Sequence, residues 1–243
     1  MVRPQQAILA AVSAGMVMMA LAVSCGDGTP TQGSPQVQAV DAREVLREAV
    51  AEVLRLESAA FVLEHLTGTT TLFPGLEMSK AFGVVDIPDK FRITVEAESA
   101  FPRSFVEIKV VTIGDKAYMT DVITGQWREV SLGVLPIDLS NLGQTLADII
   151  EAVEAPSHIN DELLKGVDSH HIRGRIQSQE LAGLVPGAGQ GFDVQLDLWL
   201  EQSRSLLLQV LITGKVVPTD SQDTVRLLTL DDINLPVEIT APR

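Results

Sequence analysis

The chain has 243 residues with 18 basic and 32 acidic side chains, and its formal net charge is −14. An isoelectric point near 4.6 argues against nucleic-acid binding, which needs clustered Lys and Arg. A single cysteine excludes an internal disulfide and a cysteine-rich zinc site. The mean hydropathy of +0.22 indicates either a membrane protein or a soluble domain with surplus apolar surface, and the placement of the apolar residues decides between these.

The N-terminal segment resembles a bacterial export signal. Arg3 is the only charge before an apolar run from Ala7 to Val23, which is short for a spanning helix but typical of a signal-peptide core. Small residues then lead directly into Cys25, as in a lipobox, where diacylglycerol is joined to the cysteine and the preceding residues are removed. We expect residues 1–24 to be a lipoprotein signal peptide and Cys25 to be lipidated. The alternatives are an uncleaved anchor and an ordinary secretory signal.

The next segment is predicted to be a flexible tether. Residues 26–36 are mainly Gly, Pro, Ser, Thr and Gln, a composition that cannot bury enough apolar surface to order itself. We therefore expect residues 25–40 to comprise the lipidated cysteine and a tether, and residues 41–243 to form one folded domain.

The domain is predicted to open with an amphipathic helix and to continue mainly in strands. Apolar residues recur at helical spacing over residues 41–57, with Asp41 as the N-cap. A second apolar stripe predicts a helix over 138–153, and a short helix is expected over 177–184. Alternating apolar and polar residues predict strands over 61–72, 90–96, 104–113, 116–122, 126–130, 193–201, 206–216 and 225–233. This series predicts an α+β domain with an antiparallel sheet that has one apolar and one polar face.

No catalytic or metal-binding constellation is evident in the sequence. The histidines are His65, His158, His170 and His171, and none of them pairs at metal-ligand spacing on a predicted helix. His170 and His171 should point to opposite faces of a strand, because successive side chains alternate. We expect partly exposed surface histidines, no enzyme activity, no cofactor and no metal.

Several strands carry more apolar residues than one buried face requires. Residues 206–212 are nearly continuously apolar, and a strand that is apolar on both sides needs cover on both sides. That surplus is consistent with the lining of a cavity for an apolar ligand, or with a well-filled core.

Two short motifs and the end of the chain resemble one known family of lipoproteins. Residues 123–130 (ITGQWREV) look like the turn-plus-Trp hairpin of the LppX_LprAFG lipoproteins, and residues 164–175 (LKGVDSHHIRGR) look like their Gly-Val-x-x-x-His-x-x-Gly strand pair. The ending at residues 235–242 (LPVEITAP) is similar as well. The resemblance covers roughly residues 41–240.

The resemblance implies a LolA/LolB-like half-barrel, in which a single curved antiparallel sheet with helices on its concave face encloses a hydrophobic cavity. It implies binding of an acylated lipid or glycolipid, and it carries no catalytic residues. The apolar faces of the predicted strands and of helix 138–153 supply the candidate cavity residues, and that helix is the expected lid. They are Phe91, Ile93, Val95, Val106, Ile108, Val110, Leu146, Ile149, Ile150, Leu196, Leu198, Leu208 and Val210.

The resulting hypothesis is a lipid carrier anchored at the outer face of the cell membrane, which moves its ligand within the envelope. An envelope transporter is its candidate partner. The alternative is a lipid-anchored interaction protein of the envelope with a filled core and no lipid ligand.

Overall fold

The computed structural model describes residues 39–135 and 137–243. The predicted signal peptide, Cys25 and all but the last two residues of the predicted tether lie outside this part of the chain. Residues 39–243 form one unit. No helix among the described residues is long and apolar enough to cross a membrane.

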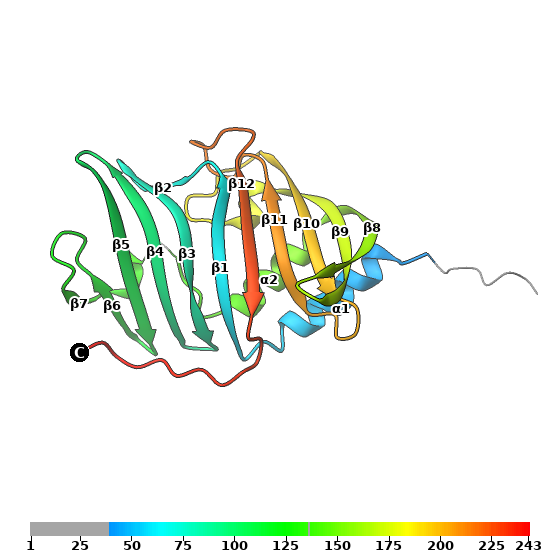
Figure 1. Ribbon diagram of the computed structural model, residues 1–243, viewed down its shortest axis with the longest axis horizontal. Coiled ribbons are helices and arrows are strands. Elements are labelled where there is room, and N and C mark those ends of the chain that lie inside the picture. The colour runs from blue at the N-terminus through cyan, green and yellow to red at the C-terminus, as the bar shows by residue number, and fades with distance from the viewer. Residues whose placement is uncertain (1–38, 136) are drawn as a thin grey trace, which may run out of the picture. The chain divides into compact units, whose positions relative to one another are not determined.

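The described chain forms one open, curved antiparallel sheet of twelve strands (Figure 1). The strand order is β7-β6-β5-β4-β3-β1-β12-β11-β10-β9-β8, and the short β2 pairs with β3 outside this path. The strands span Ser58–Thr67 (β1), Thr70–Phe73 (β2), Leu76–Asp86 (β3), Lys90–Ala100 (β4), Arg103–Ile113 (β5), Lys116–Thr120 (β6), Trp127–Val130 (β7), Glu154–Leu164 (β8), Val167–Gln177 (β9), Asp193–Glu201 (β10), Leu207–Thr213 (β11) and Val225–Asp231 (β12). The predicted α+β half-barrel is confirmed.

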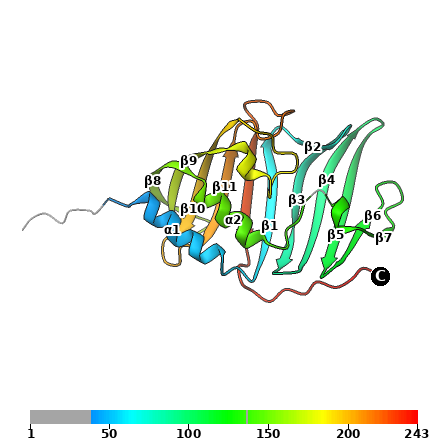
Figure 2. The ribbon, with the colours of Figure 1, turned by 180° about the vertical axis from the view of Figure 1, so that it is seen from behind.

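Two helices lie side by side on one face of the sheet, over the half that contains β8 to β12 (Figure 2). Helix α1 spans Ala42–Val53, and Asp41 caps it as predicted, because its carboxylate accepts a hydrogen bond of 2.9 Å from the Arg43 amide. Helix α2 spans Leu142–Glu151. Both are shorter than the sequence pattern predicted.

The core lies between these helices and the sheet. The apolar stripe of α2, with Leu146, Ile149 and Ile150, is buried against inward-facing strand residues such as Leu196 and Leu198. These side chains are at most 2% exposed, so they form a buried apolar core between the helices and this half of the sheet. Burying each such side chain contributes about 1.5–3 kcal/mol, which makes this half the stable base of the domain.

Some predicted elements were wrong. The strand predicted over 61–72 is divided into β1 and β2 at Gly68, whose φ of +79° suits glycine. The helix predicted over 177–184 is only a 3₁₀ turn, Ser178–Leu181. Strands β3 and β8 carry no clean alternation in sequence and were not predicted.

Candidate functional site

An apolar pocket lies at the other half of the sheet, away from the two helices. Its floor is built by the paired strands β4 and β5. Successive side chains of a strand point to opposite faces, so every second residue of these strands lies on the pocket side of the sheet. Phe91, Ile93 and Val95 of β4 stand beside Ile108 and Val110 of β5 in this floor. These five residues belong to the predicted cavity set, and the structure brings them together.

The roof of the pocket is the segment between β7 and α2. Val134, Leu135 and Ile137 line it from above, next to the 3₁₀ turn Leu132–Val134 (η1). The walls come from apolar residues of β2, β3 and β6 and from the turn that follows β6. They are Leu72, Phe73, Leu76, Met119 and Val122. Every described side chain that lines the pocket is apolar, so none of these residues supplies an acid, a base, or a nitrogen or oxygen ligand for a metal.

The pocket has a volume of about 90 Å³. An apolar cavity of about 150 Å³ suffices for benzene, and sites for drug-sized ligands run to about 300–1,000 Å³. The pocket in its present form is therefore too small for a long acyl chain. Its rim is open to solvent, since Phe73, Val122 and Val134 line it and are each about half exposed, at 52%, 46% and 55%.

The remaining predicted cavity residues lie elsewhere. Val106 is buried on β5 but does not line the pocket. Leu208 lies at a bulge of β11 and lines a separate pocket with Leu164 and Val167. The others belong to the filled core below the helices: Leu146, Ile149, Ile150, Leu196, Leu198 and Val210. The sequence pattern identified the inward face of the sheet but could not distinguish the residues that the helices cover from those that line the apolar pocket.

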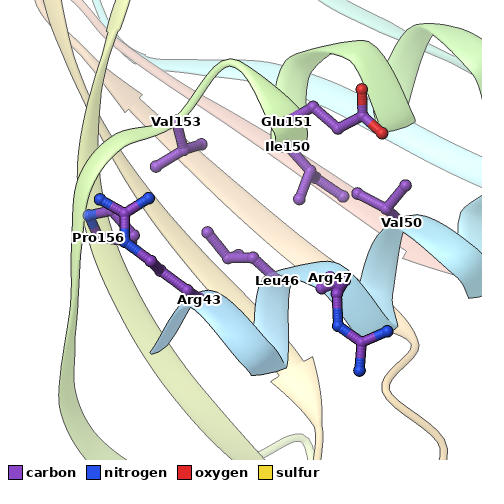
Figure 3. Close-up of a pocket in the computed structure, with 8 residues that line it drawn as sticks. All are labelled: Arg43, Leu46, Arg47, Val50, Ile150, Glu151, Val153 and Pro156. Carbon is purple, nitrogen blue, oxygen red and sulfur yellow. The ribbon is translucent and has the colours of Figure 1, made fainter. Parts of the chain in front are cut away.

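A second hollow, of about 200 Å³, lies between α1, the end of α2 and the start of β8 (Figure 3). Figure 3 shows Leu46 and Val50 of α1 facing Ile150 and Val153. Three charged side chains, Arg43, Arg47 and Glu151, complete its lining. An acyl chain would leave these charges partly desolvated, so the smaller apolar pocket is the better candidate for an apolar ligand despite its volume.

Buried charges gather at the top of β1 and β12, away from the pocket lining. The Arg226 guanidinium is fully buried and donates to Asp220 at 2.8 Å and to the Thr70 hydroxyl at 2.8 Å. His65 lies within the same network, 2.9 Å from Thr70 Oγ1. Burial lowers the pKa of His65, an effect that the hydrogen bond with the Ser79 carbonyl opposes and the nearby Arg226 charge reinforces. This network provides polar partners for the buried Arg226 guanidinium. None of its residues lines the apolar pocket.

His170 and His171 point to opposite faces of β9, as predicted. His171 stacks on Trp199 with ring centroids 4.5 Å apart, and its Nε2 lies 2.6 Å from Asp197 Oδ1. The expectation of a partly exposed histidine is wrong here, because His171 is buried under the indole ring. His170 instead joins His158 at Asp161 on the other face.

The fold and the pocket define an open antiparallel half-barrel with an apolar pocket on its helix-bearing face. The chain belongs to the LppX_LprAFG lipoprotein family, whose model matches residues 41–239. No curated protein matches the chain.

Two solved structures have the same fold. LprF from Mycobacterium bovis superposes with a TM-score of 0.65 at 16% identity, over 83% of this chain and 96% of the other. LppX from Mycobacterium tuberculosis gives a TM-score of 0.54 at 18% identity, over 82% and 100%. At such low identity the likeness concerns the fold, and the pocket's occupant has to be argued from this chain's own residues.

Proposed function

We propose that this protein is a membrane-anchored carrier that binds the acyl chains of a lipid or glycolipid in the pocket of β4 and β5. The observation that supports this most directly is the wholly apolar lining, which reaches from buried Phe91 and Ile93 to half-exposed Phe73 at the rim. An apolar surface that continues from the core to the solvent suits a ligand whose chain is apolar and whose headgroup is polar.

Acyl chains longer than the present pocket require the roof to move. The roof is held mainly by local contacts: the Val134 amide bonds to Ser131, and the Leu135 amide bonds to Leu132. No residue of η1 is buried. A segment with few buried apolar contacts opens at low free-energy cost. We therefore propose residues 131–135 and 137 as the lid. They take the place of segment 138–153, which the sequence suggested as the lid but whose apolar stripe is buried in the core.

The free energy gained by sheltering an acyl chain exceeds the cost of opening the roof. Each methylene removed from water contributes about 0.8 kcal/mol, so a chain of a dozen methylenes gains roughly 10 kcal/mol before the costs of association. Displacing two half-buried roof side chains, Leu135 and Ile137, costs a few kcal/mol at most by the same measure.

Filling the pocket tests this proposal. Val95→Phe places a ring into the pocket, whereas Thr94→Phe places the same ring on the opposite face of the same strand. We expect lipid adducts in native mass spectra of wild type and Thr94→Phe isolated from bacterial membranes, and their loss in Val95→Phe. Affinity for a fluorescent long-chain fatty acid should fall at least tenfold in Val95→Phe only.

A wild-type protein with neither lipid adducts nor fatty-acid binding would overturn the carrier proposal. The small pocket volume and the filled core below α1 and α2 would then favour the alternative, a lipid-anchored interaction protein of the envelope. Equal loss of binding in both variants would show that added bulk on the sheet, and not the pocket, is responsible.

A further inference from the structure

Three potential metal ligands converge on the hairpin of β8 and β9. Asp161 Oδ1 lies 2.8 Å from His158 Nε2 and 2.6 Å from His170 Nδ1. One ligand atom from each of the three side chains lies within 4.8 Å of the others. The imidazole rings meet edge to face, with centroids 5.6 Å apart and an interplanar angle of 78°. Two ring nitrogens therefore approach the same carboxylate oxygen, and the three ligand atoms lie close enough together to share one ion.

A β-bulge creates this arrangement. His158 and Asp161 are three positions apart, so in a regular strand they would face opposite sides of the sheet. The register with β9 shifts between His158, opposite Ile172, and Asn160, opposite His171, which leaves Ile159 as the extra residue. The bulge returns Asp161 to the face of His158, directly opposite His170.

The cluster lies at the margin of the core-facing side of the sheet. His158 is opposite Ile172 and His170 is opposite Leu200, and both of these apolar partners are fully buried. The two imidazoles are about one-fifth exposed, and Asp161 is half exposed. Strand β8 ends the sheet, so the free side of the cluster opens at the sheet edge. The backbone pairing of β8 with β9 fixes the positions of the three side chains, and the side of the cluster at the sheet edge remains accessible to an ion.

We propose that His158, Asp161 and His170 bind a divalent transition-metal ion, with Zn²⁺ as the best match. Two imidazoles and one carboxylate form an open zinc site that leaves a fourth position for water or an exogenous ligand. This replaces the sequence-based expectation that the protein has no metal site.

The present distances are compatible with the proposed ion. Zinc–nitrogen and zinc–oxygen bonds of about 2.0–2.2 Å place tetrahedral ligand atoms roughly 3.3 Å apart. The hydrogen bonds to Asp161 from His158 and His170 must lengthen by about 0.5 and 0.7 Å to admit the ion, which a small rotation of a half-exposed carboxylate can accomplish. The net negative charge of the chain also favours cation binding.

Calorimetric titration of the purified full-length protein with ZnCl₂, after treatment with a chelator, tests the proposal. Wild type should bind one equivalent, and Co²⁺ in its place should give the visible absorption of a tetrahedral or five-coordinate site. Asp161→Asn and His170→Asn should each weaken Zn²⁺ binding at least tenfold, because each removes one of three ligands.

Asp168→Asn is the matched control, since it removes one exposed carboxylate from the same hairpin without touching the cluster. It should bind Zn²⁺ as wild type does. Circular dichroism establishes that each variant is folded, and His158→Gln provides a third ligand variant if one of the others is not. The proposal is overturned if wild type binds no Zn²⁺, or if Asp161→Asn and Asp168→Asn weaken binding equally.

Discussion

Asp197 is a buried carboxylate on the outer face of the sheet, and its hydrogen-bond partners stabilise its ionised form. Its side chain is 2% exposed, yet it accepts hydrogen bonds from His171 at 2.6 Å, from Arg173 at 2.7 Å and from Gln195 at 2.9 Å. Burial by itself would raise the pKa of Asp197, but these hydrogen bonds and the Arg173 charge outweigh it and hold the pKa below its usual value.

A lowered carboxylate pKa makes stability depend on pH in the acid range. The contribution of Asp197 is fully present above the unfolded-state pKa, near 3.9, and is lost as the pH falls through the lower pKa of the folded state. We predict that Asp197→Asn lowers the free energy of unfolding at pH 7 by about 1–3 kcal/mol, because charge-assisted hydrogen bonds are lost in a buried setting. The gap to wild type should shrink as the pH drops below 4.

Urea unfolding at pH 7, 5 and 3.5 measures this difference. Asp193→Asn is the control, since Asp193 lies on the same strand but is exposed. Its effect should stay within about 0.5 kcal/mol at each pH. A deficit in Asp197→Asn that persists unchanged at pH 3.5 would contradict the assignment of the ionised carboxylate as the stabilising species.

At the scale of elements, the contact between α1 and α2 depends on one glycine. A Cβ added at Gly143, in the first turn of α2, would lie 2.5 Å from the carbonyl oxygen of Val53 at the end of α1. No real side chain tolerates that approach, so the helices would have to separate. The close approach explains how a short helix of two to three turns can pack so fully on its neighbour and on the sheet.

We predict that Gly143→Ala destabilises the domain by about 1–3 kcal/mol, even though alanine is the better helix former by about 1 kcal/mol. Gly133→Ala is the matched control in the lid, where the nearest atom to the added Cβ, Ser131 Oγ, is 3.9 Å away. Chemical unfolding of both variants gives the comparison. A Gly143→Ala protein as stable as wild type would mean that the helices shift apart at little cost.

The elements that the sequence failed to predict have a common physical cause. Strand β8 is an edge strand with an irregular register and mostly exposed side chains, so it has no buried face to impose alternation. Strand β3 contains a register shift between Met78 and Lys80, which breaks the period of two. Strands β4, β5 and β10 bury one regular face, so the alternation of apolar and polar residues in their sequences predicted them.

The same reasoning applies to the two candidate sites. The floor of the apolar pocket was predictable, because Ile93 and Ile108 belong to alternating strands. Its roof was not, since Val134 and Leu135 follow no secondary-structure period. The proposed metal site depends on the bulge at Ile159, and spacing alone would place its ligands on opposite faces.

At the scale of the whole molecule, the half-barrel combines a half that two helices cover with a half that a loop covers. The two helices cover the sheet from β8 to β12, and only a loop with a 3₁₀ turn covers β4 and β5 (Figure 2). Buried apolar contacts are thereby concentrated below the helices, so the proposed lid would be able to move without unfolding the core. A carrier needs this division, because it must load and release its ligand repeatedly while remaining folded.

The anchor proposed at Cys25 belongs to this scale, since it decides where the domain acts. Two acyl chains joined to Cys25 would hold the protein at a membrane, as each buried methylene contributes about 0.8 kcal/mol. We predict that Cys25→Ala moves the protein from the membrane fraction to the soluble fraction of cell lysates, and that Ser34→Ala, in the same predicted tether, leaves it in the membrane fraction. Incorporation of radiolabelled palmitate should be lost in Cys25→Ala alone. Membrane retention of Cys25→Ala after a carbonate wash would instead identify residues 7–23 as an uncleaved anchor.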